Sequence, residues 1–308
     1  MEKIGEPGLS SQHAYLITVY NNFPVLDVLL RMLDDPRNEV FIHVDRRVRN
    51  FDYEYFAKLC RSATVIFVPR VRVHWGHYSQ IQSVFNLLER ATETPHSYYH
   101  LLSGADLPIK SQDHIHDFCA RHSGKEFVGY GQGDFRSRLR WFYFLNYSRR
   151  PNSRPKELAA HFFAFAEKVS LSLQSLLGVN RLQGFDQDIK KGSDWFSVTH
   201  QAAEYLLANR EKVARLFRFA DIPTEFYAQT FLWNSQFRDH IFDTENEFRG
   251  SLRHVDWSRG SPYVFRRNDL SDLLASPALF ARKFEADVDM GIVRDLLKVV
   301  SPQHPTPH

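Results

Sequence analysis

The first half of the chain alternates short apolar runs with amphipathic stretches, and this alternation restricts the possible folds more than any other feature. HAYLITVY (13–20) and EVFIHV (39–44) have the length and the residue types of buried strands. Between them, Pro24 suits the first turn of a helix, and apolar residues recur at helical spacing over 24–34. A strand, a helix and a second strand in this order predict parallel strands covered by helices, which is an α/β fold.

The same alternation of predicted strands and helices continues along the chain, without an internal repeat or a linker. Further strands are predicted over 64–68, 98–103, 194–199 and 253–257. Further helices are predicted over 79–90, 157–177, 202–217, 223–233, 268–274 and 289–299. We therefore expect one domain over 13–300, preceded by an arm (1–12) and followed by a frayed tail (301–308).

Composition excludes several classes of protein. With 43% hydrophobic residues and a net charge of +3, the chain is globular and not strongly basic. Two cysteines, Cys60 and Cys119, supply neither a disulfide scaffold nor a cysteine-based zinc site, which fits a reducing compartment. No apolar stretch has the length of a membrane span, so a cytoplasmic location is expected.

One segment is strongly basic. Residues 135–156 contain seven basic residues and no acidic one, interleaved with aromatic residues. This pattern suits an anionic membrane surface, an anionic glycan or a nucleic acid, and a solvated loop explains it equally well. No nucleic-acid recognition motif accompanies the charge, so we expect no nucleic-acid partner. Peripheral contact with the inner face of a membrane stays open.

Catalytic motifs of the common nucleotide and hydrolase families are missing from the sequence. There is no P-loop, no G-x-G-x-x-G, no H-E-x-x-H and no G-x-S-x-G. Asp-x-Asp occurs at 186–188 and 287–289, far downstream of the early strands, and is not expected to bind metal. The pairs His74/His77 and His114/His116 are interpreted as ordinary surface histidines.

Seven motifs, in order, resemble the core-2/I-branching N-acetylglucosaminyltransferase family, which also contains peptide O-xylosyltransferases. They are HAYLITVYNN with FIHVD (41–45), VHWGHYS (73–79), YYHLLSGADLPIKS (98–111), GSDWFSVT (192–199), PTEFYAQT (223–230), HVDWSRGSP (254–262) and LFARKFE (279–285). The resemblance, to a bacterial-type member, implies a GT-A-like fold and an inverting transfer from a UDP-sugar without a metal.

The resemblance also implies a catalytic base. The Glu of the family's Pro-x-Glu motif falls on Glu225. A single displacement needs one base, which removes the proton of the acceptor hydroxyl as its oxygen attacks the anomeric carbon. A carboxylate in the first turn of a helix is common without catalysis, because the helix N-terminus favours it.

Fixed cations are expected to meet the charge of the leaving diphosphate when no metal does so. The family's Lys falls on Lys283. Its Arg falls near Arg259, where the sequence departs from the family pattern, with Arg266 or Arg267 as the reserve. Arg282 is expected to point away from Lys283 in an extended segment.

The remaining candidates contact the nucleotide or the sugars. Asp45, at a strand end, matches the family's uridine-contacting position, and Asp106 should lie near the donor sugar or diphosphate. Trp257 matches an acceptor-site aromatic, Trp75 is a candidate on the sugar-nucleotide side, and Asp194 approaches donor or acceptor, although either tryptophan could equally be core.

The expected reaction moves GlcNAc from UDP-GlcNAc to a hydroxyl of a glycan or lipid-linked acceptor, in the synthesis of a bacterial surface polysaccharide. UDP-xylose is the alternative donor, because pocket volume separates the two sugars and cannot be read from sequence. A catalytically silent protein that binds sugar nucleotides or glycans is the alternative that is not an enzyme.

Overall fold

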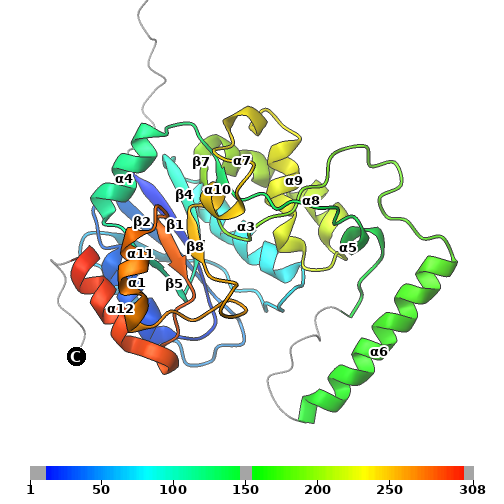
Figure 1. Cartoon of the computed structure of the whole chain (residues 1–308), viewed down its shortest axis with the longest axis horizontal. Coiled ribbons are helices and arrows are strands. Elements are labelled where there is room, and N and C mark those ends of the chain that lie inside the picture. Colours follow the sequence, from blue (N-terminus) through cyan, green and yellow to red (C-terminus); the bar gives the residue numbers. More distant parts are fainter. Residues whose placement is uncertain (1–11, 146–154, 302–308) are drawn as a thin grey trace, which may run out of the picture.

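A six-stranded, mostly parallel sheet forms the centre of the computed structural model, which describes residues 12–145 and 155–301 (Figure 1). The strands lie in the order β3-β2-β1-β4-β7-β6. Their bounds are β1 His13–Val19, β2 Asn38–Val44, β3 Thr64–Phe67, β4 Tyr98–Ser103, β6 Phe127–Val128 and β7 Phe196–Thr199. Strands β1 to β4 run parallel, whereas β7 pairs antiparallel with β4 and β6. The predicted α/β class is confirmed.

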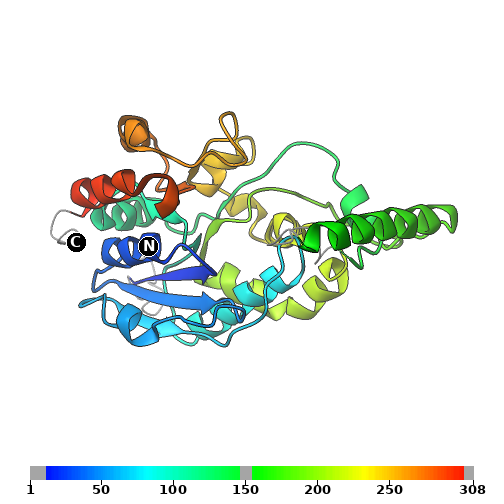
Figure 2. The same cartoon turned by 90° about the horizontal axis from the view of Figure 1, so that it is seen from below.

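Helices cover both faces of this sheet (Figure 2). Strand β1 shows why: Tyr15 and Ile17 enter one hydrophobic core, and the alternate residues Ala14 and Leu16 enter the other. The first core contains α1 Phe23–Met32, α4 Gln112–Arg121 and α12 Ala286–Val300. The second contains α3 Ser79–Ala91, α7 His200–Ala208, α8 Arg210–Phe217 and α9 Tyr227–Trp233.

A second, three-stranded sheet packs beside the first core. It consists of β5 Asp106–Pro108, β9 Phe280–Arg282 and β8 Arg253–Val255, in the order β5-β9-β8. Asp106 pairs with Arg282 across β5 and β9, and Val255 of β8 pairs with the same Arg282. The small sheet therefore brings three segments far apart in sequence to one place.

One long helix, α6 Pro155–Leu176, projects from the body of the molecule in both ribbon views (Figures 1 and 2). Among the described residues, no helix is both long and apolar enough to cross a bilayer. The short elements are α2 Tyr53–Ala57, α5 Ser137–Arg140, η2 Pro223–Glu225, η3 Arg238–His240, α10 Glu247–Ser251, η4 Arg267–Asp269 and α11 Leu270–Ala275.

Two helices predicted as continuous are broken. The stretch 202–217 divides at Asn209, whose side-chain amide donates to the Tyr205 carbonyl oxygen and so competes with the helical pattern. The stretch 223–233 starts as a 3₁₀ turn and becomes α9 only after Phe226. The division into arm, domain and tail stays a prediction, because 1–11 and 302–308 lie outside the described residues.

Candidate functional site

The candidate site lies at the edge of the central sheet where its parallel strands end. Ligands of open α/β sheets bind beyond this edge. Because β7 is antiparallel to β4, with Tyr98 opposite Thr199, the residues that precede β7 lie beside those that follow β4. Asp194 and Asp106, which are 88 residues apart in sequence, therefore reach the same edge.

Glu225 stands on the 3₁₀ turn η2, which other parts of the site hold in place. The Ile222 N–H donates to the Gly76 carbonyl oxygen at 3.2 Å, and Phe226 is buried. The Glu225 carboxylate accepts a hydrogen bond from Arg138 Nη1 at 2.6 Å and lies 3.3 Å from Lys191 Nζ. The predicted base therefore sits between two cations, neither of which the sequence predicted as a site residue.

The segment before β7 contacts the Glu225 turn directly through its backbone. The Gly192 N–H donates to the Glu225 carbonyl oxygen at 2.9 Å, and Gln229 Nε2 donates to the Ser193 carbonyl oxygen at 2.6 Å. A Cβ on Gly192 would lie 1.8 Å from the Gly129 carbonyl oxygen, so only glycine fits at this approach. Close packing therefore requires the glycine of the GSDW motif. This packing places the neighbouring residues Lys191 and Asp194 against Glu225.

Asp194 is the most electrostatically perturbed carboxyl of this group. Its Oδ1 is enclosed and has no hydrogen-bond partner. Burial raises the pKa of Asp194 to about 6, and the negative charge of Glu225 adds to the rise, against the opposing effects of Thr224, Arg282 and Lys191. A carboxyl that titrates near neutrality beside a second carboxylate is a frequent feature of active sites.

Arg282 and Asp106 form an ion pair next to this cluster. The Arg282 Nε atom lies 3.2 Å from Asp106 Oδ1, and its guanidinium stacks 4.2 Å from the centre of the Trp195 ring. Asp106 is buried, and its other carboxylate oxygen accepts from the Ser103 N–H at 2.6 Å. Asp106 thus shapes the turn after β4 and holds Arg282. Its predicted donor-binding role stays a prediction.

The predicted diphosphate cations occupy the loops around β9. Lys283 Nζ lies 2.5 Å from Glu285 Oε1, so it contacts a different partner from Arg282. Arg259 is paired with two carboxylates, Asp256 at 2.5 Å and Asp269 at 2.7 Å. The reserve candidates are both exposed: Arg266 donates its backbone N–H to Asp269, and the Arg267 side chain pairs with Asp295.

Asp45 directly follows β2, and the arginines next to it in sequence, Arg46, Arg47 and Arg49, line a hollow of about 630 Å³ together with Arg72. Burial acts to raise the pKa of Asp45, but hydrogen bonds and charge from Arg47 outweigh it, so the pKa is lowered. Arg47 Nη2 lies 2.7 Å from Asp45 Oδ2. The hollow is a concentrated positive surface at the sheet edge, and the sequence analysis did not identify it.

The two predicted sugar-contacting tryptophans are surface residues. Trp75 is 40% exposed and precedes Gly76, which bonds to the turn of Glu225. Trp257 is 58% exposed and follows β8, whose Val255 is in register with Arg282. Neither belongs to the core, so both can present an aromatic face to a ligand.

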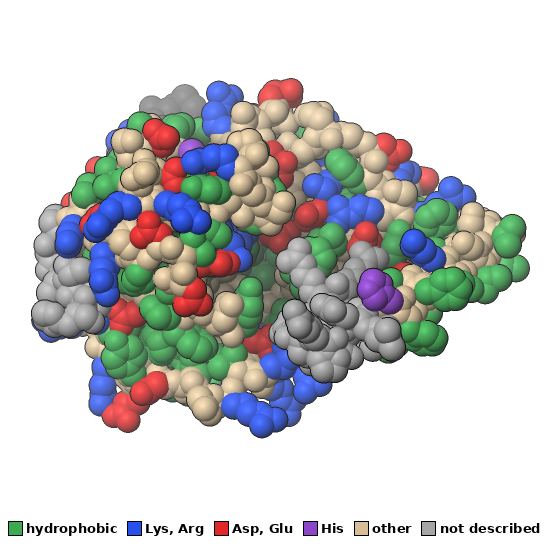
Figure 3. Space-filling model, turned by 60° about the horizontal axis from the view of Figure 1, so that its bottom comes forward, with side chains coloured by type: hydrophobic (Ala, Val, Ile, Leu, Met, Phe, Trp, Pro, Cys, Tyr) green, Lys and Arg blue, Asp and Glu red, His purple; other side chains and the backbone are tan. Residues whose placement is uncertain are grey.

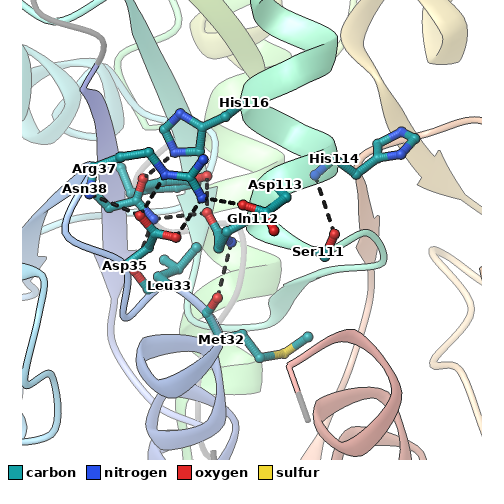
Figure 4. A network of polar contacts seen from close by, with 11 residues as sticks. Met32, Leu33, Asp35, Arg37, Asn38, Ser111, Gln112, Asp113, His114 and His116 are labelled. Atoms are coloured by element: carbon teal, nitrogen blue, oxygen red, sulfur yellow. Dashed lines mark hydrogen bonds and ion pairs between the residues drawn. The ribbon is translucent and has the colours of Figure 1, made fainter. Parts of the chain in front are cut away.

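The prediction that the His114/His116 pair is ordinary surface is wrong for His116. His114 is exposed, but His116 is buried and its ring stacks on that of His13 at 3.8 Å. The His116 Nε2 atom lies 2.9 Å from Asn38 Oδ1 (Figure 4). The reason is that α4 turns this face toward the start of β2, where Gln112 also bonds Asn38. Burial is the main cause that lowers the pKa of His116 to about 4.

The late Asp-x-Asp motifs have other partners in the structure. Asp188 accepts from Trp233 Nε1 at 3.0 Å, and Asp289 accepts the N–H groups of Arg267 and Gly291. Among the described residues, the cluster with ligand-like spacing is His13, His100 and Cys119, which lies in the core and not at the sheet edge.

Comparison with known proteins gives consistent results. The family model "Core-2/I-Branching enzyme" matches residues 13–273. Xylosyltransferase sqv-6 of Caenorhabditis briggsae is 25% identical over 308 residues, which cover 89% of this chain and 35% of that protein. Xylosyltransferase 1 of Homo sapiens is 28% identical over 280 residues, covering 83% of this chain and 27% of that protein. The chain thus spans about a third of these relatives.

The solved structure of mouse xyloside xylosyltransferase 1, in its apo form, is a weaker match. Its TM-score is 0.36 at 10% identity, and the match covers 87% of this chain and 96% of that one. A similarity at this level does not bear on function.

Proposed function

Because the chain belongs to the core-2/I-branching enzyme family, we propose that it is a glycosyltransferase that moves a sugar from UDP to an acceptor hydroxyl group with inversion. The observation that carries the proposal is the meeting of Glu225, Asp194, Arg138 and Lys191 at the carboxyl edge of the sheet. Acidic and basic groups are concentrated here where a nucleotide-sugar crevice is expected.

The proposed reaction is one displacement. Glu225 accepts the proton of the acceptor hydroxyl while the oxygen attacks the anomeric carbon, and the bond from that carbon to UDP breaks with its electron pair leaving on the diphosphate. For this the acceptor oxygen must replace a cation beside Glu225, where Arg138 and Lys191 now lie. We assign to Asp194, whose pKa is raised by the nearby charge of Glu225, the role of accepting a hydrogen bond from the acceptor sugar.

The charge that develops on UDP requires cations fixed in the site. Lys283 is our first candidate, and the arginine hollow beside Asp45 is a second source. Either set of cations would stabilise the charge on the leaving UDP without a metal ion. For the donor, the relatives are named xylosyltransferases, which favours UDP-xylose over the UDP-GlcNAc expected from the sequence.

The test is UDP release by the purified chain with UDP-xylose or UDP-GlcNAc, in EDTA and in magnesium or manganese. We expect slow donor hydrolysis in EDTA, stronger with UDP-xylose, and its loss in Glu225→Gln. Glu211→Gln is the matched control, because Glu211 is an exposed residue of α8. Hydrolysis that survives Glu225→Gln would remove the base from the mechanism. Binding of UDP-sugars without turnover by any variant would favour the silent binding protein.

A further inference from the structure

The projecting helix α6 carries an apolar stripe on its solvent side. The exposed side chains are Phe162, Phe165, Val169, Leu173, Leu176 and Leu177. At about 100° per residue they fall within a face about 120° wide, over a length of roughly 24 Å. Phe162 is 67% exposed, Phe165 66% and Leu176 84%. A continuous exposed apolar patch of this kind marks an interaction site.

Two buried polar side chains on the opposite side of α6 attach the helix to the body of the protein. Gln174 accepts from the Phe142 N–H at 2.7 Å and donates to the Phe142 carbonyl oxygen at 2.9 Å. Glu167, also buried, accepts from the Leu145 N–H at 3.0 Å. The hydrogen bonds therefore fix α6 with its apolar face away from the protein, which is the reverse of an ordinary surface helix.

Basic residues outnumber acidic ones in the part of the sequence that contains this stripe. Residues 135–177 contain eight basic and two acidic side chains, and Glu167, one of the two acids, is buried. In the described part of this segment, the exposed cations are Arg136 and Arg140, at the two ends of α5, and Lys168 on α6 itself. Figure 3 shows hydrophobic side chains and Lys or Arg side by side on the projecting part of this face. The part 146–154 of the basic segment predicted to contact a membrane lies outside the described residues.

We propose that α6 is an interfacial helix that docks the protein on an anionic lipid surface, with the stripe in the acyl boundary and the cations at the headgroups. An apolar face bordered by cations is the pattern of helices that lie in a membrane interface. The helix is not apolar enough to cross a bilayer, which agrees with surface docking. A second copy of the chain is a poorer occupant, because pairing two stripes would bring their like charges together.

The test is co-sedimentation of the full chain with vesicles of phosphatidylcholine alone or with about 30% phosphatidylglycerol. We expect binding to the anionic vesicles that weakens as salt rises. The double variant Phe165→Asp/Leu173→Asp should weaken binding to these vesicles about tenfold or more, because it places charge in the stripe. Its matched control, Ala164→Asp/Ser175→Asp, changes the net charge equally at exposed positions of the same helix away from the stripe and should keep most of the binding.

Three results would overturn the proposal. The first is absence of binding to anionic vesicles at low salt, and the second is equal binding by the stripe variant and its control. The third is a dimer in solution that the stripe variant makes monomeric, because the stripe would then be an interface between copies. Donor hydrolysis is measured on the same samples without vesicles, so a failure of the proposed enzymatic function is seen separately.

Discussion

Replacing Asp194 with Asn should stabilise the protein at alkaline pH while it impairs the reaction. The folded protein holds the pKa of Asp194 at about 6, above the usual value of 3.8, so the fold favours the neutral form. Two pKa units correspond to about 3 kcal/mol at 1.36 kcal/mol per unit. Because the residue as a whole is partly accessible, we expect about 1–3 kcal/mol of added stability in Asp194→Asn at pH 8.

The pH dependence gives the sign of the effect. Between pH 3.8 and about 6 the folded state binds more protons at Asp194 than the unfolded state, so this carboxyl costs stability as pH rises through that window. The advantage of Asp194→Asn should therefore be full at pH 8 and absent near pH 4. The assay is urea unfolding followed by tryptophan fluorescence at pH 4.5, 6 and 8.

The matched control is Asp186→Asn, which changes an exposed carboxyl and should leave the free energy of unfolding nearly unchanged at every pH. Donor-to-acceptor transfer by Asp194→Asn should fall by roughly 100-fold or more if the carboxylate contacts the acceptor. A variant that is less stable than the wild type at pH 8, or whose stability difference does not depend on pH, would refute the electrostatic reasoning.

Three other perturbations follow from the structure. Gly192→Ala should cost on the order of 3 kcal/mol or more in thermal or urea unfolding, because its Cβ would overlap the Gly129 carbonyl, whereas Gly104→Ala, with its nearest contact at 3.5 Å, should be tolerated. The wild-type protein should lose stability as the pH falls from 6.5 to about 4, because the unfolded state binds more protons at His116 over this range. His116→Gln should reduce this loss by up to about 3 kcal/mol in the same urea assay. Lys283→Met should weaken UDP binding about tenfold in calorimetry; unchanged affinity would move the diphosphate to the arginine hollow.

The strands and first helices could be predicted because local signals agree with the fold. The runs that form β1 and β2 are buried on both faces, so most of their residues are apolar, and Pro24 marks the start of α1. The breaks at Asn209 and Phe226 could not be predicted, because apolar periodicity continues through both positions. The bond from the Asn209 side chain to Tyr205 and the 3₁₀ turn before Phe226 interrupt the helices, and neither changes the apolar spacing.

Only some of the residues of the candidate site could be predicted from the sequence. Motifs identified Glu225 and Asp194, but two contacts that the sequence did not predict bring the site together. The Gly192 N–H bonds the Glu225 carbonyl oxygen, and the antiparallel pairing of β7 with β4 brings Asp194 to the edge where Asp106 lies. Lys191 and Arg138 were missed for different reasons. Lys191 directly precedes the GSDW motif, whereas Arg138 was counted within a basic segment assigned to the surface and instead bonds Glu225.

The hydrogen bond between Arg138 and Glu225 links the proposed active site to the proposed lipid-binding helix, because a short piece of chain that begins at Arg138 contacts both. Arg138 lies on α5 and contacts Glu225, and four residues later Phe142 is bonded to Gln174 of α6. Docking of α6 on a lipid surface would therefore hold the site near acceptors in the same surface. In Phe165→Asp/Leu173→Asp, UDP-sugar hydrolysis in solution should be unchanged, while transfer to an acceptor embedded in anionic vesicles should fall through a higher KM with little change in kcat. A fall in kcat with both substrates would instead mean that α6 shapes the site itself, through Phe142 and Arg138, and that the stripe serves the fold of the site.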